Sequence, residues 1–256
     1  MRMPSPGKIA REMRPLSGWT WRAVETQHYA LTRELVGSHA DQARLEELLE
    51  GVKPKYRSGA ERLDYLLKTP FRYEPPKRGG SRFRRPYAPY GVFYGAERPR
   101  TALIELAFHR YRFFAESPAT DLPAGELSLT VFAAGYRANR GLDLTDGELV
   151  SLRAYWVAPG DYSATQRLAE RAVASGVEVI RYESARDPET DARGWSAGRN
   201  LAILDPQVFD PPHHRRPQTW YLYMGIKEVN IRRAHGTPEE QIDLPRSVMA
   251  MPASSE

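Results

Sequence analysis

Glu105 and His109 are the two residues whose types and spacing most directly suggest chemistry. They lie four residues apart in a predicted helix, which brings both side chains to one face, one turn apart. A carboxylate and an imidazole placed in this way could exchange a proton or provide part of a metal shell. No further ligand stands nearby, and the adjacent His213 and His214 lie in a proline- and arginine-rich loop without metal-site spacing. The sequence therefore predicts no metal site and favours a histidine on the helix surface.

Two other side chains stand where predicted strands end. Ser184 follows a strand and precedes the turn-forming residues Ala185 to Pro188, which would leave its hydroxyl at the strand end. No His and Asp partners accompany it, so we expect a hydrogen-bonding group or a turn cap and not a nucleophile. Tyr94 ends another predicted strand, where its flat ring could form a pocket wall or pack in the core.

Arginine dominates the basic residues of this chain. There are 37 Lys and Arg against 32 Asp and Glu, a formal charge of +5. The planar guanidinium suits phosphate and carboxylate partners, so the excess indicates an anionic small ligand or nucleic acid, with a solvated surface as the alternative. The absence of cysteine excludes disulfides, thiolate metal sites and a cysteine nucleophile. No phosphate-binding Walker loop and no dinucleotide-binding glycine pattern is present, which disfavours a hydride-transfer dehydrogenase.

Apolar periodicity predicts the helices that position these residues. One spans Asp41 to Glu50, and a second should follow Ser58, where Ser58 and Glu61 fit a capping box. A third runs from Arg100 to about Phe114, and a fourth follows a capping box of Ser163 and Gln166 and ends at Gly176.

Runs of aromatic and β-branched residues predict the strands. These runs are residues 90–95, 127–133, 177–182, 200–205 and 220–224, with 149–157 either a strand or a short helix. Residues 71–89 carry four prolines, two adjacent glycines and six Lys or Arg, which predicts an ordered basic loop and a ligand surface. Thr237 to Glu256 is expected to be peripheral.

Several segments spread over roughly Trp21 to Phe209 form a pattern in two halves. The first half lies in Gly80-Ser-Arg-Phe-Arg-Arg-Pro-Tyr87, Gly91-Val-Phe-Tyr-Gly-Ala-Glu97 and Thr101-Ala-Leu-Ile-Glu105. The second half lies in Asp161-Tyr-Ser-Ala-Thr-Gln-Arg-Leu-Ala169, Gly176-Val-Glu-Val-Ile-Arg-Tyr-Glu-Ser184 and Asn200-Leu-Ala-Ile-Leu-Asp-Pro206. Together these segments resemble the RES domain family, which is named for an arginine, a glutamate and a serine.

By position, the resemblance makes Glu105 the family glutamate and Ser184 the family serine. For the arginine it offers two residues, Arg22 in an early aromatic–arginine pair and Arg82 in the later loop. The sequence departs from the family pattern at Arg84-Arg85-Pro86-Tyr87, which leaves Arg84 as an alternative to Arg82.

The resemblance implies an α+β fold with an ADP-ribosyltransferase-like mixed sheet core and flanking helices. It implies one RES-like domain over residues 1–256, with its core at about 21–209 and with N-terminal helical and C-terminal extensions. It further implies a toxin that cleaves the nicotinamide–ribose bond of NAD⁺ by hydrolysis or phosphorolysis and is silenced by an Xre-type antitoxin. NAD⁺ would be a substrate, and no cofactor is expected.

The expected roles follow from that chemistry. Glu105 would hold a ribose hydroxyl and stabilise the oxocarbenium-like ribose, and Arg22 and Arg82 would bind the pyrophosphate. Tyr94 would stack on the nicotinamide ring or close the pocket, and Ser184 would orient the ribose or the nicotinamide amide.

Two alternatives stay open at this point. The same site could transfer ADP-ribose to a protein, or the basic loop 71–90 with its interleaved aromatics could bind RNA. The polar, basic start of the chain and the lack of a long apolar stretch predict a cytoplasmic protein without a membrane segment. The sequence leaves a homo-oligomer open.

Overall fold

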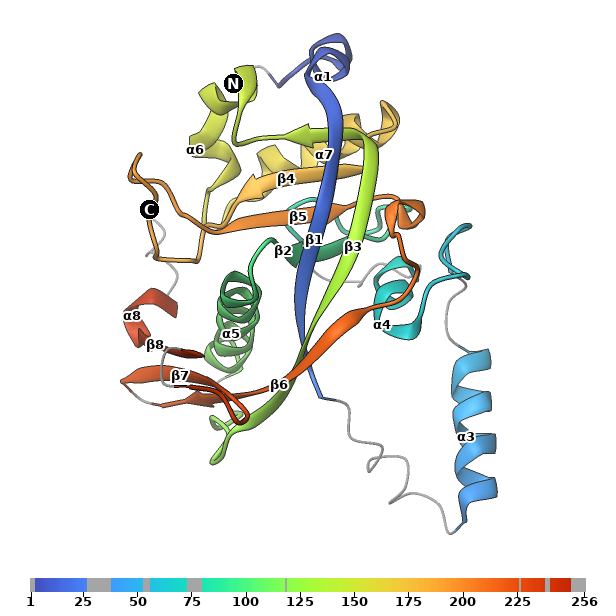
Figure 1. Cartoon of the computed structure of the whole chain (residues 1–256), viewed down its shortest axis with the longest axis vertical. Helices are drawn as coiled ribbons and strands as arrows, with labels where there is room; N and C mark the ends of the chain where they lie inside the picture. The colour runs from blue at the N-terminus through green and yellow to red at the C-terminus, as the bar shows by residue number, and fades with distance from the viewer. Residues whose placement is uncertain are drawn as a thin grey trace.

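The computed structural model describes residues 3–26, 38–52, 56–72, 80–117, 119–225, 227–237 and 240–249. Within these ranges eight strands form one mixed sheet in the order β1-β2-β5-β4-β3-β6-β7-β8 (Figure 1). The strands are β1 (Met13–Glu25), β2 (Phe93–Ala96), β3 (Leu127–Asp143), β4 (Val179–Glu183), β5 (Arg199–Ile203), β6 (Arg215–Met224), β7 (Glu228–Arg233) and β8 (Gln241–Pro245).

β3 connects the two parts of the sheet, because it pairs with three other strands. It runs antiparallel to β1 over most of its length, antiparallel to β6 near its start and parallel to β4 at its end. β1 in turn meets β2 at the pair Trp21 and Ala96. The strands β1, β2, β5, β4 and β3 therefore close into a circuit, and β6, β7 and β8 extend from it.

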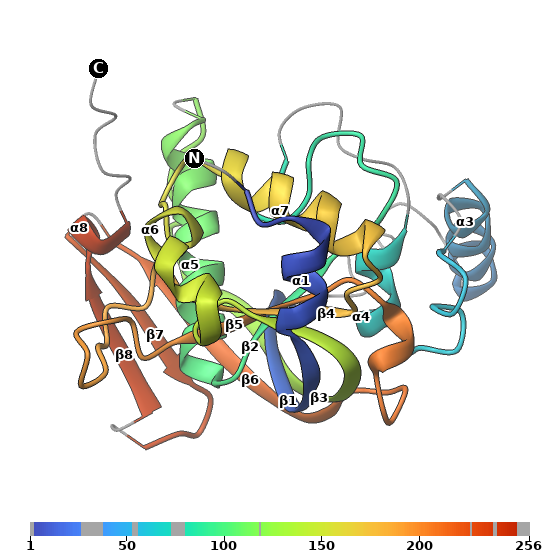
Figure 2. The ribbon, with the colours of Figure 1, turned by 90° about the horizontal axis from the view of Figure 1, so that it is seen from above.

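The structure also contains several helices. They are α1 (Pro6–Glu12), α3 (His39–Gly51), α4 (Tyr65–Lys68), α5 (Pro99–Ala115), α6 (Arg153–Trp156), α7 (Ser163–Ala174) and α8 (Arg246–Met249), with 3₁₀ turns η1 (Thr69–Phe71), η2 (Gly147–Leu152) and η3 (Pro206–Val208). α1, α6 and α7 gather near β4, whereas α5 lies beside the β6–β8 extension (Figures 1 and 2). α5 also contacts β1, β2 and α8.

α5 is the element on which the site depends, and its packing is extensive. It begins at Pro99, a residue suited to the first turn because its missing N–H has no partner to lose there. Leu103, Ile104, Ala107 and Phe108 are fully buried against strands β1, β3 and β6–β8. These contacts fix the orientation of the helix and, with it, the direction of the side chains on its opposite face.

The predicted α+β class is confirmed, and three predicted helices are found as α3, α5 and α7. The prediction of a capping box at Ser58 is wrong, because the Glu61 carboxylate accepts a hydrogen bond from the Gly59 N–H in a local turn. The helix there is the single turn α4, capped by Asp64, whose Oδ1 accepts from the Leu67 N–H at 3.1 Å.

The second capping box is also replaced by other contacts. The Ser163 N–H bonds to Asp161 at 2.8 Å, so Ser163 begins the helix without capping it. Gln166 instead donates to the carbonyl of Ser81 at 3.0 Å and holds the loop that leads to β2. Gln166, which its spacing from Ser163 predicted to be a capping residue, thus makes a tertiary contact instead.

The described part of the tail is not peripheral, which corrects the expectation for Thr237 to Glu256. Ile242 and Leu244 of β8 and Met249 of α8 are buried in the same core as α5. At the other end, β1 is a long strand that no sequence pattern predicted. In the described ranges no helix is long and apolar enough to cross a membrane.

Candidate active site

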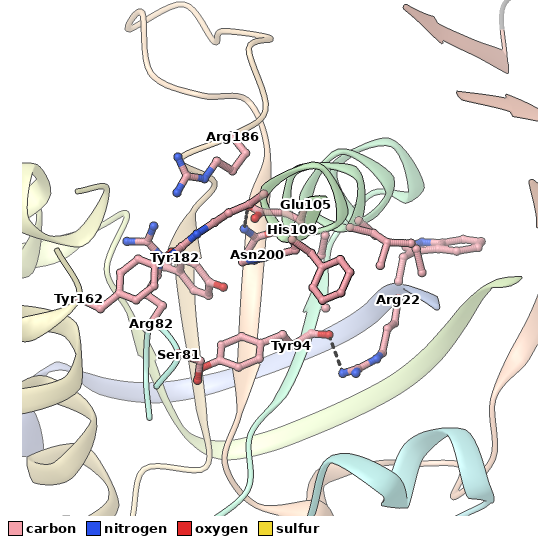
Figure 3. Close-up of a pocket in the computed structure, with 18 of the residues that line it drawn as sticks. Arg22, Ser81, Arg82, Tyr94, Glu105, His109, Tyr162, Tyr182, Arg186 and Asn200 are labelled. Carbon is pink, nitrogen blue, oxygen red and sulfur yellow. Dashed lines mark hydrogen bonds between the residues drawn. The ribbon is translucent and has the colours of Figure 1, made fainter. Parts of the chain in front are cut away.

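A cavity of about 520 Å³ lies between α5, strands β1, β2, β4 and β5, and the loop at residues 80–82. Its volume is in the range of small-molecule sites. Figure 3 shows the labelled residues around it, with Glu105 and Asn200 on one side, Arg22 on another, and Tyr94 with Ser81 below them. Elements that are far apart in the sequence therefore supply one site.

Glu105 occupies the wall of this cavity on α5. Its Oε1 accepts two hydrogen bonds, from Ser184 Oγ at 2.7 Å and from Asn200 Nδ2 at 2.6 Å. Among the described residues none bonds to Oε2. The carboxylate is thus held by one oxygen, and the other is available to a ligand.

Ser184 lies behind Glu105 and does not line the cavity. Besides donating to Glu105, its Oγ accepts from the N–H groups of Arg186 and Asp187, both at 3.1 Å. The hydroxyl is therefore fully used within the protein. Thr101 Oγ1 donates to the Asp187 carboxylate at 2.7 Å, which ties this turn to the start of α5. Ser184 positions Glu105 and caps the turn. The turn cap is one of the two roles expected from the sequence, whereas direct orientation of the ribose or the nicotinamide amide stays a prediction, because Ser184 does not line the cavity.

Arg22 enters the cavity from β1. Its Nη1 donates to the carbonyl of Tyr94 at 3.1 Å, and its guanidinium lies 4.8 Å from the centre of the Phe93 ring. Burial lowers the pKa of Arg22 to about 10, which still leaves it charged at neutral pH. Among the described residues no carboxylate forms an ion pair with it, so no described acidic group neutralises its charge.

Two further arginines line the cavity, Arg82 and Arg186. Arg82 donates to the carbonyl of Trp156 at 2.7 Å and lies over the Tyr162 ring at 4.7 Å. Arg186 donates to the carbonyl of Pro159 and stacks over the Phe108 ring at 3.6 Å, and burial lowers its pKa. Both guanidinium groups are held in fixed planes, which suits bidentate binding of phosphate.

Tyr94 forms part of the wall and also fastens the loop before β2. Its hydroxyl accepts from the Phe83 N–H at 3.0 Å and hydrogen-bonds Ser81 Oγ at 2.8 Å. Arg84 is not part of the lining, whereas Arg82 is. Of the two loop arginines that the sequence left open, the cavity therefore contains Arg82.

His109 is exposed and lines the cavity one turn after Glu105. Partial burial lowers its pKa, Glu105 opposes that effect, and Arg186, Arg112 and Arg82 add to it. The expected surface histidine is therefore on the surface, but at the site. In the described ranges no group of three or more His, Cys, Asp and Glu residues could hold a metal ion.

The two histidines of the later loop lie elsewhere. His214 Nδ1 is 2.6 Å from Asp64 Oδ2, at the start of α4. Neither His213 nor His214 lines the cavity.

Four of the five residues expected at a site, Arg22, Arg82, Tyr94 and Glu105, line one cavity, and Ser184 supports it from behind. Among the lining residues that sequence reasoning missed are the polar side chains of Asn200, Tyr162, Tyr182 and Arg186. A signal existed for each of them, because all lie inside or next to the segments that resemble the RES family, but nothing in the sequence showed that their side chains point inward.

Comparison with known proteins places this site in a family. A family model for the RES domain matches residues 55–224. Among solved structures, the chain is similar to one from the crystal structure of the M. tuberculosis MbcT–MbcA toxin–antitoxin complex. The identity is 15% over 95% of this chain and 93% of that chain, with a TM-score of 0.46. No curated protein gives a significant match. Because the RES domain model covers more than half of the sequence, the chain belongs to the RES domain family.

Proposed function

We propose that this protein cleaves the nicotinamide–ribose bond of NAD⁺ and acts as the toxin of a toxin–antitoxin pair. The observation that carries the proposal is the placement of Glu105. Glu105 lies at the wall of the cavity. Its Oε1 accepts hydrogen bonds from Ser184 and Asn200, while its Oε2 has no partner among the described residues. Membership of the RES domain family supports the same reaction.

The chemistry requires a fixed carboxylate. When the bond between ribose C1 and the pyridinium nitrogen breaks, its electron pair goes to nitrogen and positive charge develops on the ribose. Glu105 Oε2 accepts a hydrogen bond from the ribose hydroxyl next to C1 and stabilises that charge. Ser184 and Asn200 hold the carboxylate in place before the substrate arrives, so little reorganisation is needed in the transition state.

The cations of the cavity support binding of the pyrophosphate. Arg22, Arg82 and Arg186 all line it, and their donors are fixed by backbone carbonyls or by stacking on rings. A pyrophosphate carries negative charge on several oxygens, which fork-shaped guanidinium groups bind in pairs. The tyrosine rings nearby offer flat apolar surfaces for a base or for nicotinamide.

The cellular role is part of the proposal. An enzyme that consumes NAD⁺ harms its host unless it is restrained, so we propose a cognate antitoxin of the Xre type that covers the cavity. We place both proteins in the cytoplasm. A homo-oligomer is compatible with this scheme.

The test is release of nicotinamide from NAD⁺ by the purified, partner-free chain, in buffers with and without phosphate. We expect release by the parent and a loss of about a hundredfold or more in Glu105→Gln, because the ribose charge is then no longer opposed by a carboxylate. Glu126→Gln is the matched control, since Glu126 pairs with Arg232 away from the cavity. Folded protein that releases no nicotinamide in either buffer would refute hydrolysis and phosphorolysis.

The products of the same reaction identify the acceptor. ADP-ribose indicates water, and ADP-ribose 1-phosphate formed only with phosphate indicates phosphorolysis. Labelled protein in a lysate indicates ADP-ribosyl transfer, which uses the same Glu105 site. RNA binding by the basic loop 71–90 would instead weaken steeply with salt. Residues 73–79 of that loop lie outside the described residues.

A further inference from the structure

Tyr182 is a cavity residue that the proposed reaction has not used. It is 5% exposed, and its ring packs edge-on against Phe83 with 4.7 Å between ring centres. It lines the cavity, and its hydroxyl makes no hydrogen bond to another described residue; because that oxygen is not one of the fully buried unpartnered atoms, it faces the open space of the cavity. A buried tyrosine hydroxyl usually finds a partner. The packing explains the ring and leaves the hydroxyl unexplained.

The strand pairing sets this hydroxyl beside the group that holds Glu105. Tyr182 of β4 lies directly opposite Asn200 of β5, and Asn200 donates to Glu105 Oε1. Ser184, two residues after Tyr182, bonds to the same oxygen. In Figure 3 the Tyr182 hydroxyl points into the space between Glu105 and Tyr94. Tyr182 and Glu105 both line the cavity, so one ligand can reach both side chains.

The hydroxyl keeps its proton in this setting. Burial raises the pKa of Tyr182 well above its ordinary value, and the negative charge of Glu105 acts in the same direction. A protonated phenol both donates and accepts, whereas an ionised carboxylate only accepts. The two groups together match a pair of hydroxyls on neighbouring carbons.

We propose that Tyr182 binds the 3-hydroxyl of the ribose whose 2-hydroxyl is bound by Glu105. This inference rests on the proposed function, which places the ribose of NAD⁺ at Glu105. Tyr182 then determines specificity for a complete ribose diol, and a sugar that lacks the 3-hydroxyl leaves the buried tyrosine hydroxyl without a partner.

The experiment measures binding of ADP-ribose by calorimetry, so that it does not depend on bond cleavage. Tyr182→Phe removes only the hydroxyl and keeps the ring against Phe83, and we expect affinity to fall about five- to tenfold. Tyr136→Phe is the matched control, because Tyr136 is also a buried tyrosine but does not line the cavity. Equal melting temperatures confirm that both variants are folded.

A second ligand tests the contact itself. ADP-ribose whose terminal ribose lacks the 3-hydroxyl should bind the parent about as weakly as ADP-ribose binds Tyr182→Phe. In that variant the loss of the 3-hydroxyl should cost nothing further. A parent-like affinity of Tyr182→Phe, or equal penalties for the deoxy ligand in both proteins, overturns the inference.

The outcomes also separate this inference from the proposed function. If the parent binds ADP-ribose through Tyr182 but releases no nicotinamide from NAD⁺, the contact between Tyr182 and the ribose diol is supported and the proposed cleavage of NAD⁺ is refuted. If the parent cleaves NAD⁺ and Tyr182→Phe binds normally, cleavage stands and the diol contact fails. No binding of ADP-ribose to the parent overturns the diol contact.

Discussion

At the scale of residues, the position of Glu105 depends on donors from two strand ends. Ser184 follows β4 and Asn200 lies in β5, and both bond to Oε1 at 2.6–2.7 Å. The Ser184 hydroxyl also accepts two backbone N–H groups, so it cannot turn away from Glu105 without losing them. The carboxylate is thus held in place by two donors, of which Asn200 itself lines the cavity and Ser184 does not.

Asn200→Asp tests this preorganisation. A second carboxylate next to Glu105 repels its charge, so one of the two should hold a proton at neutral pH and the apparent pKa of the pair should rise. We expect nicotinamide release at pH 7 to fall at least about tenfold and to recover partly as the pH increases. The measurement is kcat against pH. Asn139→Asp, an added carboxylate on the exposed part of β3, is the control, and an unshifted profile in Asn200→Asp would contradict the role.

Arg22 leads to a second prediction about pH. Its pKa of about 10 keeps it charged through the neutral range, so its contribution to ADP-ribose binding should be constant there and lost as the pH rises through about 10. In Arg22→Lys the same burial acts on a group whose usual pKa is only about 10.4, so binding should weaken at a lower pH. Calorimetry of ADP-ribose binding between about pH 6 and 9 distinguishes the parent from Arg22→Lys. If the affinity of both proteins depends on pH in the same way, Arg22 does not contact the anion.

The sequence predicted which residues belong to the site better than it predicted where their side chains point. Glu105, Ser184 and the two arginines Arg22 and Arg82 were found because their surroundings resemble a known family. Asn200 is the first residue of one of the segments that resemble the family, but its contact with Glu105 depends on how β5 pairs with β4. Such pairing joins residues far apart in the chain, so it cannot be predicted from local sequence patterns.

At the scale of elements, the junction of β1 and β2 sets the shape of the cavity wall. Gly95 lies there, and a Cβ at this position would be 2.2 Å from Thr20 Oγ1 and 3.0 Å from the Trp21 carbonyl. Both β1 and β2 line the cavity close to this point. The two strands approach as they do because residue 95 has no side chain.

Gly95→Ala should therefore destabilise the protein and disturb the site. Separating the strands to fit a methyl group costs about 1–3 kcal/mol, by analogy with overpacked cores. Urea unfolding measures that loss, and ADP-ribose affinity should fall with it because Arg22 moves with β1. Gly125→Ala provides the control, since a Cβ there meets nothing within 4 Å. Equal stability of the two variants would be inconsistent with a tight junction.

Elements with a clear apolar period were predicted well, and β1 was not. α5 and α7 carry buried stripes that a helical period explains. β1 contains Pro15, Gly18 and several polar residues, and few of its side chains are buried, so it lacks the alternation of an ordinary strand. Its length is supported by continuous pairing with β3, a tertiary contact that overrides weak local preference.

At the scale of the whole molecule, the end of the chain supports the site from a distance. β8 and α8 bury Ile242, Leu244 and Met249 in the core that holds α5. α5 carries Glu105, so the C-terminal strand packs in the same core as the helix that positions this cavity residue. Sequence alone suggested a peripheral tail because the segment is short and has no long apolar run.

Leu244→Ala measures how much this packing contributes. Removal of a fully buried leucine side chain usually costs about 2–5 kcal/mol, and we expect that loss in urea unfolding. Gln241→Ala, on an exposed position of the same strand, should change stability by less than about 0.5 kcal/mol. If the two variants have similar stability, the tail does not support α5.

The most direct test of NAD⁺ cleavage at Glu105 is the amount of nicotinamide that the parent and Glu105→Gln release from NAD⁺ at the same protein concentration and with matched melting temperatures. We expect release by the parent and about a hundredfold less by the variant, because only the charged oxygen at the cavity wall is lost. Equal release by both proteins would show that Glu105 is not the catalytic carboxylate, and no release by either would contradict NAD⁺ cleavage itself.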